Sequence, residues 1–156
     1  MNKDISILIT GPIDDRTYES IDSYCDQGFG EIIVSTWEDE DLTLLNKASK
    51  KYKITTSSYP KNLNQINNHG CRFYQSYLTW KGCNVSTKPF VIRTRSDEIY
   101  PDLNKFIKNL SNHPNRVHTT DNGFWKTHPA CFSTHLFGGK TNTIKEGCKL
   151  IVLNCE

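Results

Sequence analysis

The stretch Asp4-Ile-Ser-Ile-Leu-Ile-Thr-Gly-Pro12 decides how this chain of 156 residues folds. Its first seven residues form a nearly continuous apolar run, which is typical of a strand buried on both faces of a sheet. Gly11 and Pro12 end this strand, and residues 15–26 then carry apolar side chains at helical spacing. The apolar run Glu31-Ile-Ile-Val-Ser-Thr36 follows as a second buried strand. The stretch therefore predicts two strands joined by a helix.

The rest of the chain continues this alternation. Short apolar or β-branched segments predict further strands at 53–56, 89–94, 116–120 and 130–137. Helical periodicity lies between or after them, at 39–51, 63–80, 102–110 and 141–149. Strands that alternate with helices connect by right-handed crossovers into a mainly parallel sheet. The sequence therefore predicts a single three-layer α/β/α domain that spans residues 1–156.

Composition excludes several classes of protein. The net charge is only +2 and the lysines are spread among acidic residues, which argues against a nucleic-acid partner. The chain has no run of about twenty apolar residues, so we expect no membrane span. Its start reads as a strand rather than a signal peptide, from which we expect a cytoplasmic protein. The six cysteines lack zinc-ligand or Cys-x-x-Cys spacing, so we expect free thiols.

The strand at 89–94 leads into a cluster of charged side chains. Two arginines and two carboxylates follow within six residues, namely Arg93, Arg95, Asp97 and Glu98. In α/β proteins, ligands bind just beyond the carboxyl ends of the strands. Guanidinium and carboxylate groups placed there suit a ligand with phosphate at one end and hydroxyls or a metal at the other. The alternative interpretation is an exposed loop with local ion pairs, which contribute little.

Small polar residues and a tryptophan follow the other strands. The first strand ends in Thr10-Gly11-Pro12 and the second in Ser35-Thr36-Trp37. Such a rim could hold a nucleobase against an aromatic ring and donate hydrogen bonds to a ribose or a diphosphate. Strand termination is the alternative explanation for each serine or threonine alone. We predict that this rim and the arginine–carboxylate cluster line one crevice.

An amide-rich segment, Asn62-Leu-Asn-Gln-Ile-Asn-Asn-His69, begins the helix expected at 63–80. Its amides, Asn67 among them, could contact the base or the sugar hydroxyls of a ligand, and Arg72 one turn later could contact a phosphate. Helix capping in an asparagine-rich chain explains the same pattern. The later segment Phe137-Gly-Gly-Lys-Thr141 lacks the first glycine of a P-loop, so its glycines are expected to let the backbone turn closely.

Four of these segments together resemble a known family. They are Ile7-Leu-Ile-Thr-Gly-Pro12, Ile32-Ile-Val-Ser-Thr-Trp-Glu38, Ile92-Arg-Thr-Arg-Ser-Asp97 and Leu136-Phe-Gly-Gly139. Their order and spacing are similar to those of the WavE-type lipopolysaccharide-synthesis family, glycosyltransferases of GT-A-like fold. The resemblance covers nearly the whole chain, although members of the family are usually longer. It implies that a nucleoside-diphosphate sugar binds across the strand ends.

The resemblance also implies roles for particular residues. Asp97 falls where GT-A enzymes carry the Asp-x-Asp motif that holds a divalent cation, so Asp97 with Glu98 would bind Mn²⁺ or Mg²⁺. Alternatively, Arg93 and Arg95 neutralise the diphosphate themselves. Asp121 or His135 would then be the base that activates an acceptor hydroxyl, if the reaction inverts the sugar.

The sequence leaves three functions open. The first is a cytoplasmic glycosyltransferase that transfers a sugar to a glycan, lipid or protein acceptor, and the second is a non-catalytic module that binds nucleotide sugars. The third, a Rossmann-type enzyme such as a methyltransferase, is disfavoured because the first strand-turn lacks Gly-x-Gly-x-x-Gly. A homodimer is a further possibility, because so short a chain leaves apolar surface to cover.

Overall fold

The computed structural model describes residues 1–60, 70–120 and 135–153. Within these residues, six strands form one sheet in the order β3-β2-β1-β4-β6-β5. The strands are β1 (Ile5–Thr10), β2 (Glu31–Trp37), β3 (Lys53–Ser57), β4 (Phe90–Arg95), β5 (His118–Thr119) and β6 (Phe137–Lys140). The helices are α1 (Asp15–Asp26), α2 (Gly70–Val85), α3 (Asn104–Asn112) and α4 (Thr141–Leu153), with 3₁₀ turns η1 (Asn2–Asp4) and η2 (Leu42–Lys47).

The sheet is mainly parallel, as predicted. The strand β1 lies in the middle, with β2 and β4 parallel to it on either side, and β3 parallel to β2. The strand β6 runs antiparallel to β4, and β5 runs antiparallel to β6. The carboxyl ends of β1, β2, β3 and β4 therefore meet at one edge of the sheet, where ligands bind in this class of fold.

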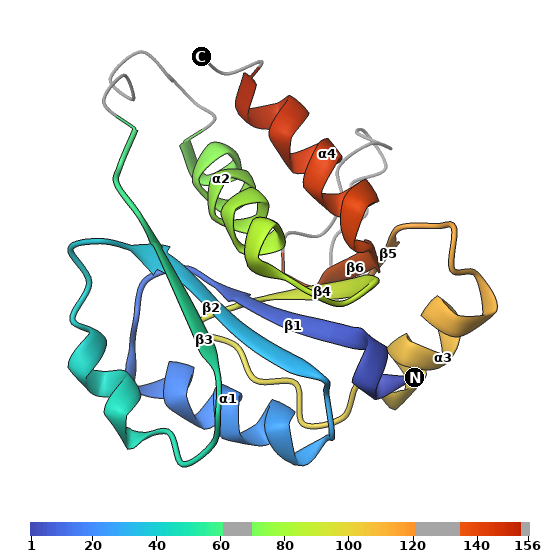
Figure 1. The fold of residues 1–156 in the computed structure, drawn as a ribbon, viewed down its shortest axis with the longest axis horizontal. Coiled ribbons are helices and arrows are strands. Elements are labelled where there is room, and N and C mark those ends of the chain that lie inside the picture. The colour runs from blue at the N-terminus through green and yellow to red at the C-terminus, as the bar shows by residue number, and fades with distance from the viewer. Residues whose placement is uncertain (61–69, 121–134, 154–156) are drawn as a thin grey trace.

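Helices cover both faces of the sheet, with α2 and α4 on one side and α1 and α3 on the other (Figure 1). Alternate residues of each strand point to opposite faces, which divides the core in two. The face toward α1 and α3 buries Ile5, Ile7, Ile9, Ile21, Tyr24, Ile32, Val34, Ile92, Ile107 and Leu110. The face toward α2 and α4 buries Leu8, Ile33, Cys83, Val91, Ile144 and Cys148. Burying each large apolar side chain contributes roughly 1.5–3 kcal/mol, which fixes the three layers.

The helix α2 packs very closely on the sheet. Gly82 lies directly over Leu8 of β1, so that a Cβ atom at this position would overlap the Leu8 methyl groups. The absence of a side chain at Gly82 lets α2 approach β1, and α2 also packs along α4. This close approach brings the first turns of α2 near the carboxyl ends of β1 and β2.

The helix predicted at 39–51 is wrong in extent, because only Leu42–Lys47 are helical and they form a 3₁₀ turn. The physical reason lies in the contacts of the residues that follow. The backbone N–H groups of Ser49 and Lys50 donate to the carboxylate of Asp22 on α1. The chain is therefore extended here and attached to α1 instead of continuing the helix.

The strand predicted at 130–137 also differs, since residues 130–134 lie outside the described part of the chain and β6 begins only at Phe137. The glycine-rich segment that was expected to be a turn is itself this strand. A Cβ atom on Gly138 would lie 2.7 Å from the carbonyl oxygen of Val91, so a glycine suits this close pairing with β4. The remaining predicted elements overlap those of the structure. The strand β5 is shorter and α4 is longer than expected, and α2 ends later, at Val85, while residues 63–69 of its predicted span lie outside the described residues.

Candidate functional site

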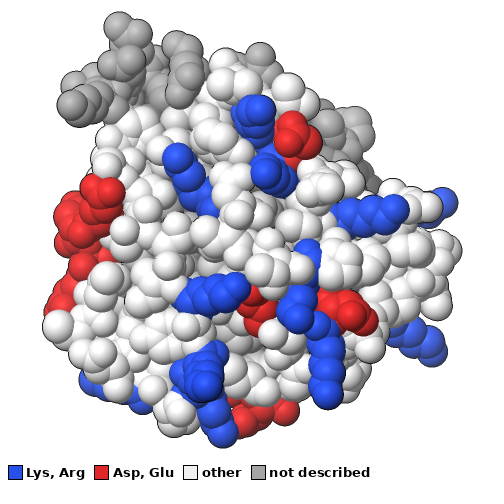
Figure 2. Space-filling model, viewed as in Figure 1, with Lys and Arg blue, Asp and Glu red and all other residues white. Residues whose placement is uncertain are grey.

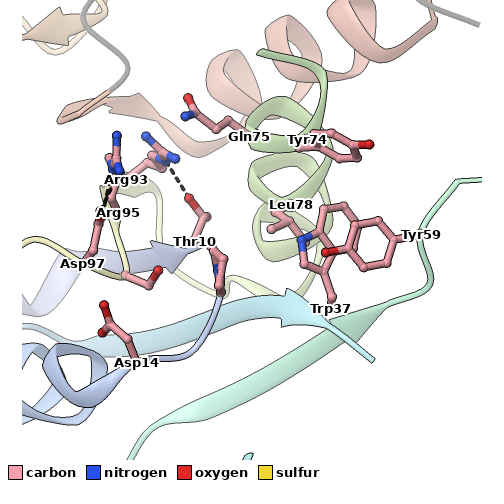
Figure 3. Close-up of a pocket in the computed structure, with 13 residues that line it drawn as sticks. Thr10, Asp14, Trp37, Tyr59, Tyr74, Gln75, Leu78, Arg93, Arg95 and Asp97 are labelled. Atoms are coloured by element: carbon pink, nitrogen blue, oxygen red, sulfur yellow. Dashed lines mark hydrogen bonds and ion pairs between the residues drawn. The ribbon is translucent and has the colours of Figure 1, made fainter. Parts of the chain in front are cut away.

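A pocket of about 570 Å³ lies at the carboxyl ends of β1, β2 and β4, on the side of the sheet that α2 covers (Figure 3). Its volume lies in the range of small-molecule binding pockets. The lining residues are Thr10, Gly11, Pro12, Asp14, Trp37, Tyr59, Tyr74, Gln75, Leu78, Arg93, Arg95, Ser96 and Asp97. They come from three strand ends, from the chain beyond β3 and from α2.

One end of the pocket is aromatic. The ring of Trp37, the last residue of β2, stacks on Tyr59 with centroids 4.2 Å apart and meets the edge of Tyr74 at 5.6 Å. Tyr77 of α2 lies parallel to Trp37 at 5.9 Å. Trp37 is buried between these rings, whereas Tyr59 is 45% exposed. Tyr59 is therefore the most exposed of these four rings.

The other end of the pocket carries two arginines. Arg93 is only 1% exposed, because it projects from β4 into the layer between the sheet and α2. Its Nε donates to the hydroxyl of Thr10 at 2.6 Å, and its guanidinium lies 5.6 Å from the centroid of the Phe137 ring. Burial lowers the pKa of Arg93 to about 10, so the side chain keeps its positive charge at neutral pH.

Arg95 forms a bidentate ion pair with Asp97. Nε and Nη2 of Arg95 donate to the two carboxylate oxygens of Asp97 at 2.8 and 2.5 Å. These hydrogen bonds lower the pKa of Asp97 and raise that of Arg95. Both groups are therefore charged across the neutral pH range, and Figure 3 draws them beside Arg93.

The turn after β1 holds the strand ends together. Gly11 has a φ of +135°, and its N–H donates to the carbonyl of Ser35. A Cβ atom at Gly11 would lie 2.5 Å from the Ser96 hydroxyl, so a glycine is required by both conformation and space. Nearby, Asp14 caps α1 by accepting hydrogen bonds from the backbone of Arg16 and Thr17.

The structure brings together many of the residues that the sequence singled out. The pocket is lined by Thr10, Gly11, Pro12, Trp37, Arg93, Arg95 and Asp97. The arginine–carboxylate cluster and the turn after β2 thus meet in one crevice. Asn67 and Asp121 lie outside the described residues, and so does the side chain of Arg72.

Two predicted ligand-binding residues lie elsewhere. Ser35 is fully buried and donates its hydroxyl to the Leu78 carbonyl at 2.7 Å, which fastens β2 to α2. Thr36 is also fully buried, and the alternation along β2 places it on the opposite face from Trp37. Neither lines the pocket, and both pack inside the protein, so their predicted contact with a ligand stays a prediction that this pocket does not support.

Glu98 and His135 do not line the pocket but contact each other next to it. His135 Nδ1 pairs with Oε1 of Glu98, and the Tyr100 hydroxyl donates to Oε2 at 2.9 Å. Glu98 Oε1 also lies 3.8 Å from Nε of Arg95. The His135 side chain is 42% exposed, so it is open to solvent beside the arginine end of the pocket.

The metal site implied by the family resemblance does not fit these contacts. Both oxygens of Asp97 are bound by Arg95, and both oxygens of Glu98 are engaged by Tyr100 and His135. Across residues 1–60, 70–120 and 135–153, no group of three or more His, Cys, Asp or Glu side chains is placed to hold a metal ion. The described residues therefore do not form a site in which Asp97 and Glu98 together hold Mn²⁺ or Mg²⁺.

Sequence reasoning missed the contribution of α2. Tyr74, Gln75 and Leu78 line the pocket, but the aromatic and apolar residues of this helix were interpreted only as its buried face. A signal was present, because Tyr74 and Gln75 put polar groups next to an aromatic stripe where a core helix would carry aliphatic residues. Tyr59 also follows a predicted strand, the one at 53–56, so its position placed it at the same edge of the sheet as Trp37.

Solved structures have the same fold. The glucosyl-3-phosphoglycerate synthase from Mycobacterium tuberculosis, in complex with Mn²⁺, UDP and phosphoglyceric acid, is 13% identical with a TM-score of 0.57, over 96% of this chain and 64% of that one. A glycosyltransferase involved in glycosylation of the major capsid of PBCV-1 is 18% identical, with a TM-score of 0.56. The match covers 97% of this chain and 67% of that one. The chain has a GT-A-like fold. A 4-diphosphocytidyl-2C-methyl-D-erythritol synthase from Anaerococcus prevotii is 12% identical, with a TM-score of 0.60. The match covers 98% of this chain and 78% of that one.

These likenesses establish the fold and nothing finer, because the identities are low. No protein-family model matches the chain. No curated protein matches its sequence either. The resemblance to the WavE-type family therefore stays a prediction.

The surface adds two observations. In Figure 2 a group of acidic side chains lies at the left edge, while basic side chains spread over the middle and lower part of the face, some of them beside acidic ones. Among the helices that the structure describes, none combines the length and the apolar character needed to cross a membrane.

Proposed function

We propose that this protein is a glycosyltransferase that binds a nucleoside-diphosphate sugar in the pocket and transfers the sugar to a glycan, lipid or protein acceptor. One observation carries the proposal: a single pocket has an aromatic wall at one end and two arginines at the other. A nucleoside diphosphate has the same polarity, with a flat base at one end and two phosphates at the other.

The aromatic end suits the base. Tyr59 is exposed on one face and fixed from behind by Trp37, which gives a rigid surface for stacking. Stacking of a base on an aromatic side chain contributes about 1–3 kcal/mol and tolerates every base. The amide of Gln75, on the first turns of α2, extends toward the arginine end of the pocket, where it would hydrogen-bond to the sugar or the diphosphate (Figure 3).

The arginine end suits the diphosphate. In sugar transfer the bond between the anomeric carbon and the β-phosphate oxygen breaks, and its electron pair stays on that oxygen. Arg93 and Arg95 are positive and already in place, so they would stabilise this developing charge without reorganisation. The fold that this chain shares with glycosyltransferases supports the assignment.

The base that removes the acceptor proton remains a prediction. His135 is anchored at Nδ1 by Glu98 and lies next to the arginine end, a position that suits a general base. Asp121 is the other candidate and lies outside the described residues.

A nucleotidyltransferase is the second candidate. The same fold occurs in the 4-diphosphocytidyl-2C-methyl-D-erythritol synthase and in a CMP:2-keto-3-deoxy-manno-octonic acid synthetase complexed with CTP. Such an enzyme would use the arginines on a triphosphate rather than on a diphosphate sugar. A module that binds a nucleotide sugar without turnover is the third, because the chain spans only 64% of the length of the synthase that was solved with UDP.

Thermal unfolding with a ligand panel tests these alternatives. We expect a UDP-, GDP-, CMP- or dTDP-sugar to raise the melting temperature, and the stabilising sugar nucleotide to be consumed when acceptors are added. Stabilisation by a nucleoside triphosphate alone would support nucleotidyl transfer, and binding without turnover would support the module. Tyr59→Ala should abolish the shift, whereas Tyr18→Ala on α1, outside the pocket, should keep it. If no nucleotide or sugar nucleotide binds, the proposal is wrong.

A further inference from the structure

We propose that Arg95, held in place by Asp97, neutralises the diphosphate of the donor in this protein, and that donor binding needs no divalent cation. The inference rests on the proposed function, because it assumes that a nucleoside diphosphate occupies the pocket. It assigns Asp97 a role as a positioning residue for an arginine instead of a metal ligand.

The first support is the geometry of Asp97. Its two carboxylate oxygens accept two parallel hydrogen bonds from Nε and Nη2 of Arg95, an arrangement that matches the two planar groups to each other. A cation bound to Asp97 would have to displace a charge-assisted pair. Glu98, the second candidate ligand, is oriented by Tyr100 and His135 and does not line the pocket.

The second support is the charge of the surroundings. Two guanidinium groups, Arg93 and Arg95, already line this end of the pocket, and Arg93 is buried where solvent screens poorly. A divalent cation next to Asp97 would be repelled by both. A diphosphate would be attracted by both guanidinium groups. Because Asp97 already offsets the charge of Arg95, Arg93 would supply most of the electrostatic attraction and Arg95 would contribute mainly hydrogen bonds, and neither contact needs a metal.

The third support is the hydrogen-bonding capacity that Arg95 retains. A guanidinium has five N–H donors, and two of the nitrogens, Nε and Nη2, each give one to Asp97. The Arg95 side chain is 34% exposed at the pocket, so its remaining N–H groups are accessible to a phosphate. Asp97 thus fixes the plane of the guanidinium, and the diphosphate binds the rest of it.

Calorimetric titration of the full chain with UDP, GDP, CDP and dTDP tests the inference. Each titration is made in excess EDTA and again with Mn²⁺. We expect the nucleotide that binds to have the same dissociation constant in both. Arg95→Met should weaken it about tenfold or more in both conditions, since a charge-assisted contact is lost. Arg116→Met, which removes an exposed arginine outside the pocket, is the matched control and should bind normally.

Asp97→Asn separates the two roles of the carboxylate. An asparagine keeps the shape and one acceptor oxygen, so we expect it to retain EDTA-resistant binding with a modest loss of affinity. If binding instead requires Mn²⁺ and disappears in Asp97→Asn, the inference is wrong while the proposed function stands. If none of the nucleotides binds in either condition, the proposed function and the inference are both overturned. Unchanged circular dichroism spectra establish that each variant is folded.

Discussion

At the scale of single residues, Gly11 has the strictest requirement in the pocket. Gly11 directly follows β1 and lines the pocket. Its backbone has a positive φ that residues with a side chain rarely adopt. Ser96 fills the space where a Cβ atom would be. The ends of β1 and β4 depend on this fit, because Ser96 donates its N–H to the Thr10 carbonyl at 3.1 Å.

We expect Gly11→Ala to lower the free energy of unfolding by about 1–3 kcal/mol and to weaken nucleotide binding, because the backbone is strained and Ser96 is displaced. The matched control is Gly147→Ala in α4, where no atom lies within 4 Å of the added methyl group. That change should stabilise the protein by about 0.5–1 kcal/mol, as alanine does in a helix. Urea unfolding followed by circular dichroism measures both. Equal effects of the two changes would contradict this account of the turn.

Arg93 gives the second prediction at this scale. Arg93→Met keeps much of the side-chain volume but removes the bond to the Thr10 hydroxyl, so we expect a modest fall in the melting temperature while the fold is kept. Nucleotide affinity should nevertheless fall about tenfold or more, because a cation facing the diphosphate is lost. Thermal unfolding and calorimetric titration of one preparation separate the two effects. A folded variant that binds nucleotide as tightly as the wild type would contradict the proposed role.

Residue-level prediction from sequence placed side chains correctly at the carboxyl end of a strand or directly after it. Arg93, Arg95, Asp97 and Trp37 could be placed in the pocket because strand direction fixes where these positions lie. The prediction of site residues failed where it depends on the face of the sheet to which a side chain points. Thr36 directly precedes Trp37, yet it points to the other face of β2, and only the register of the strand decides this.

At the scale of elements, the amino end of the sheet is fastened by one carboxylate. Glu31 at the start of β2 accepts hydrogen bonds from Ser6 of β1 and from Thr87, which precedes β4, and it pairs with Lys53 of β3. Burial acts to raise the pKa of Glu31, but the bonds from Lys53, Ser6 and Thr87 outweigh it and lower the pKa to about 2. Three strands and a connecting loop therefore share one charged group.

This network predicts a dependence of stability on pH. Because the pKa of Glu31 is lower in the folded protein than its ordinary value of 4.5, its contribution is complete above about pH 4.5 and is lost as the pH falls toward 2. Glu31→Gln should cost about 1–3 kcal/mol at pH 7. The difference between wild type and variant should shrink as the pH is lowered through this range. Glu19→Gln on the exposed side of α1 is the control, and urea unfolding at several pH values is the measurement.

The elements also explain the limits of prediction from sequence. The strands β1, β2 and β4 were located closely because buried parallel strands are continuous apolar runs bounded by polar residues. The segment around η2 has leucines at helical spacing, but its conformation is decided by hydrogen bonds to Asp22, which is far away in sequence. Contacts of this kind have no local signal.

At the scale of the whole molecule, the pocket joins elements from distant parts of the chain. Its walls come from β1, β2, β4, α2 and the chain after β3, so occupation of the pocket links both halves of the sheet. The predicted homodimer has not been tested by the structure of one chain. It stays a prediction, for which sedimentation equilibrium is the measurement.

A bound nucleotide should therefore stabilise the molecule as a unit. At a concentration of about 100 times its dissociation constant, we expect the free energy of unfolding to rise by about 2.7 kcal/mol. The urea midpoint should increase without a change in slope, since the same surface is exposed on unfolding. An increase confined to one spectroscopic probe would mean that the pocket stabilises only part of the fold.

The layer formed by α2 and α4 contains its own chemical reporter. Cys83 and Cys148 lie in the interior between these helices and the sheet, and burial raises the pKa of their thiols to about 12 and about 11. Only a thiolate attacks an alkylating reagent, so neither sulfur reacts while the helices stay docked. In a variant whose other cysteines are replaced by serine, the alkylation rate of Cys83 and Cys148 would measure how often α2 and α4 separate from the sheet. Comparing the alkylation rate with and without nucleotide would show whether a bound nucleotide makes the separation of α2 and α4 from the sheet less frequent.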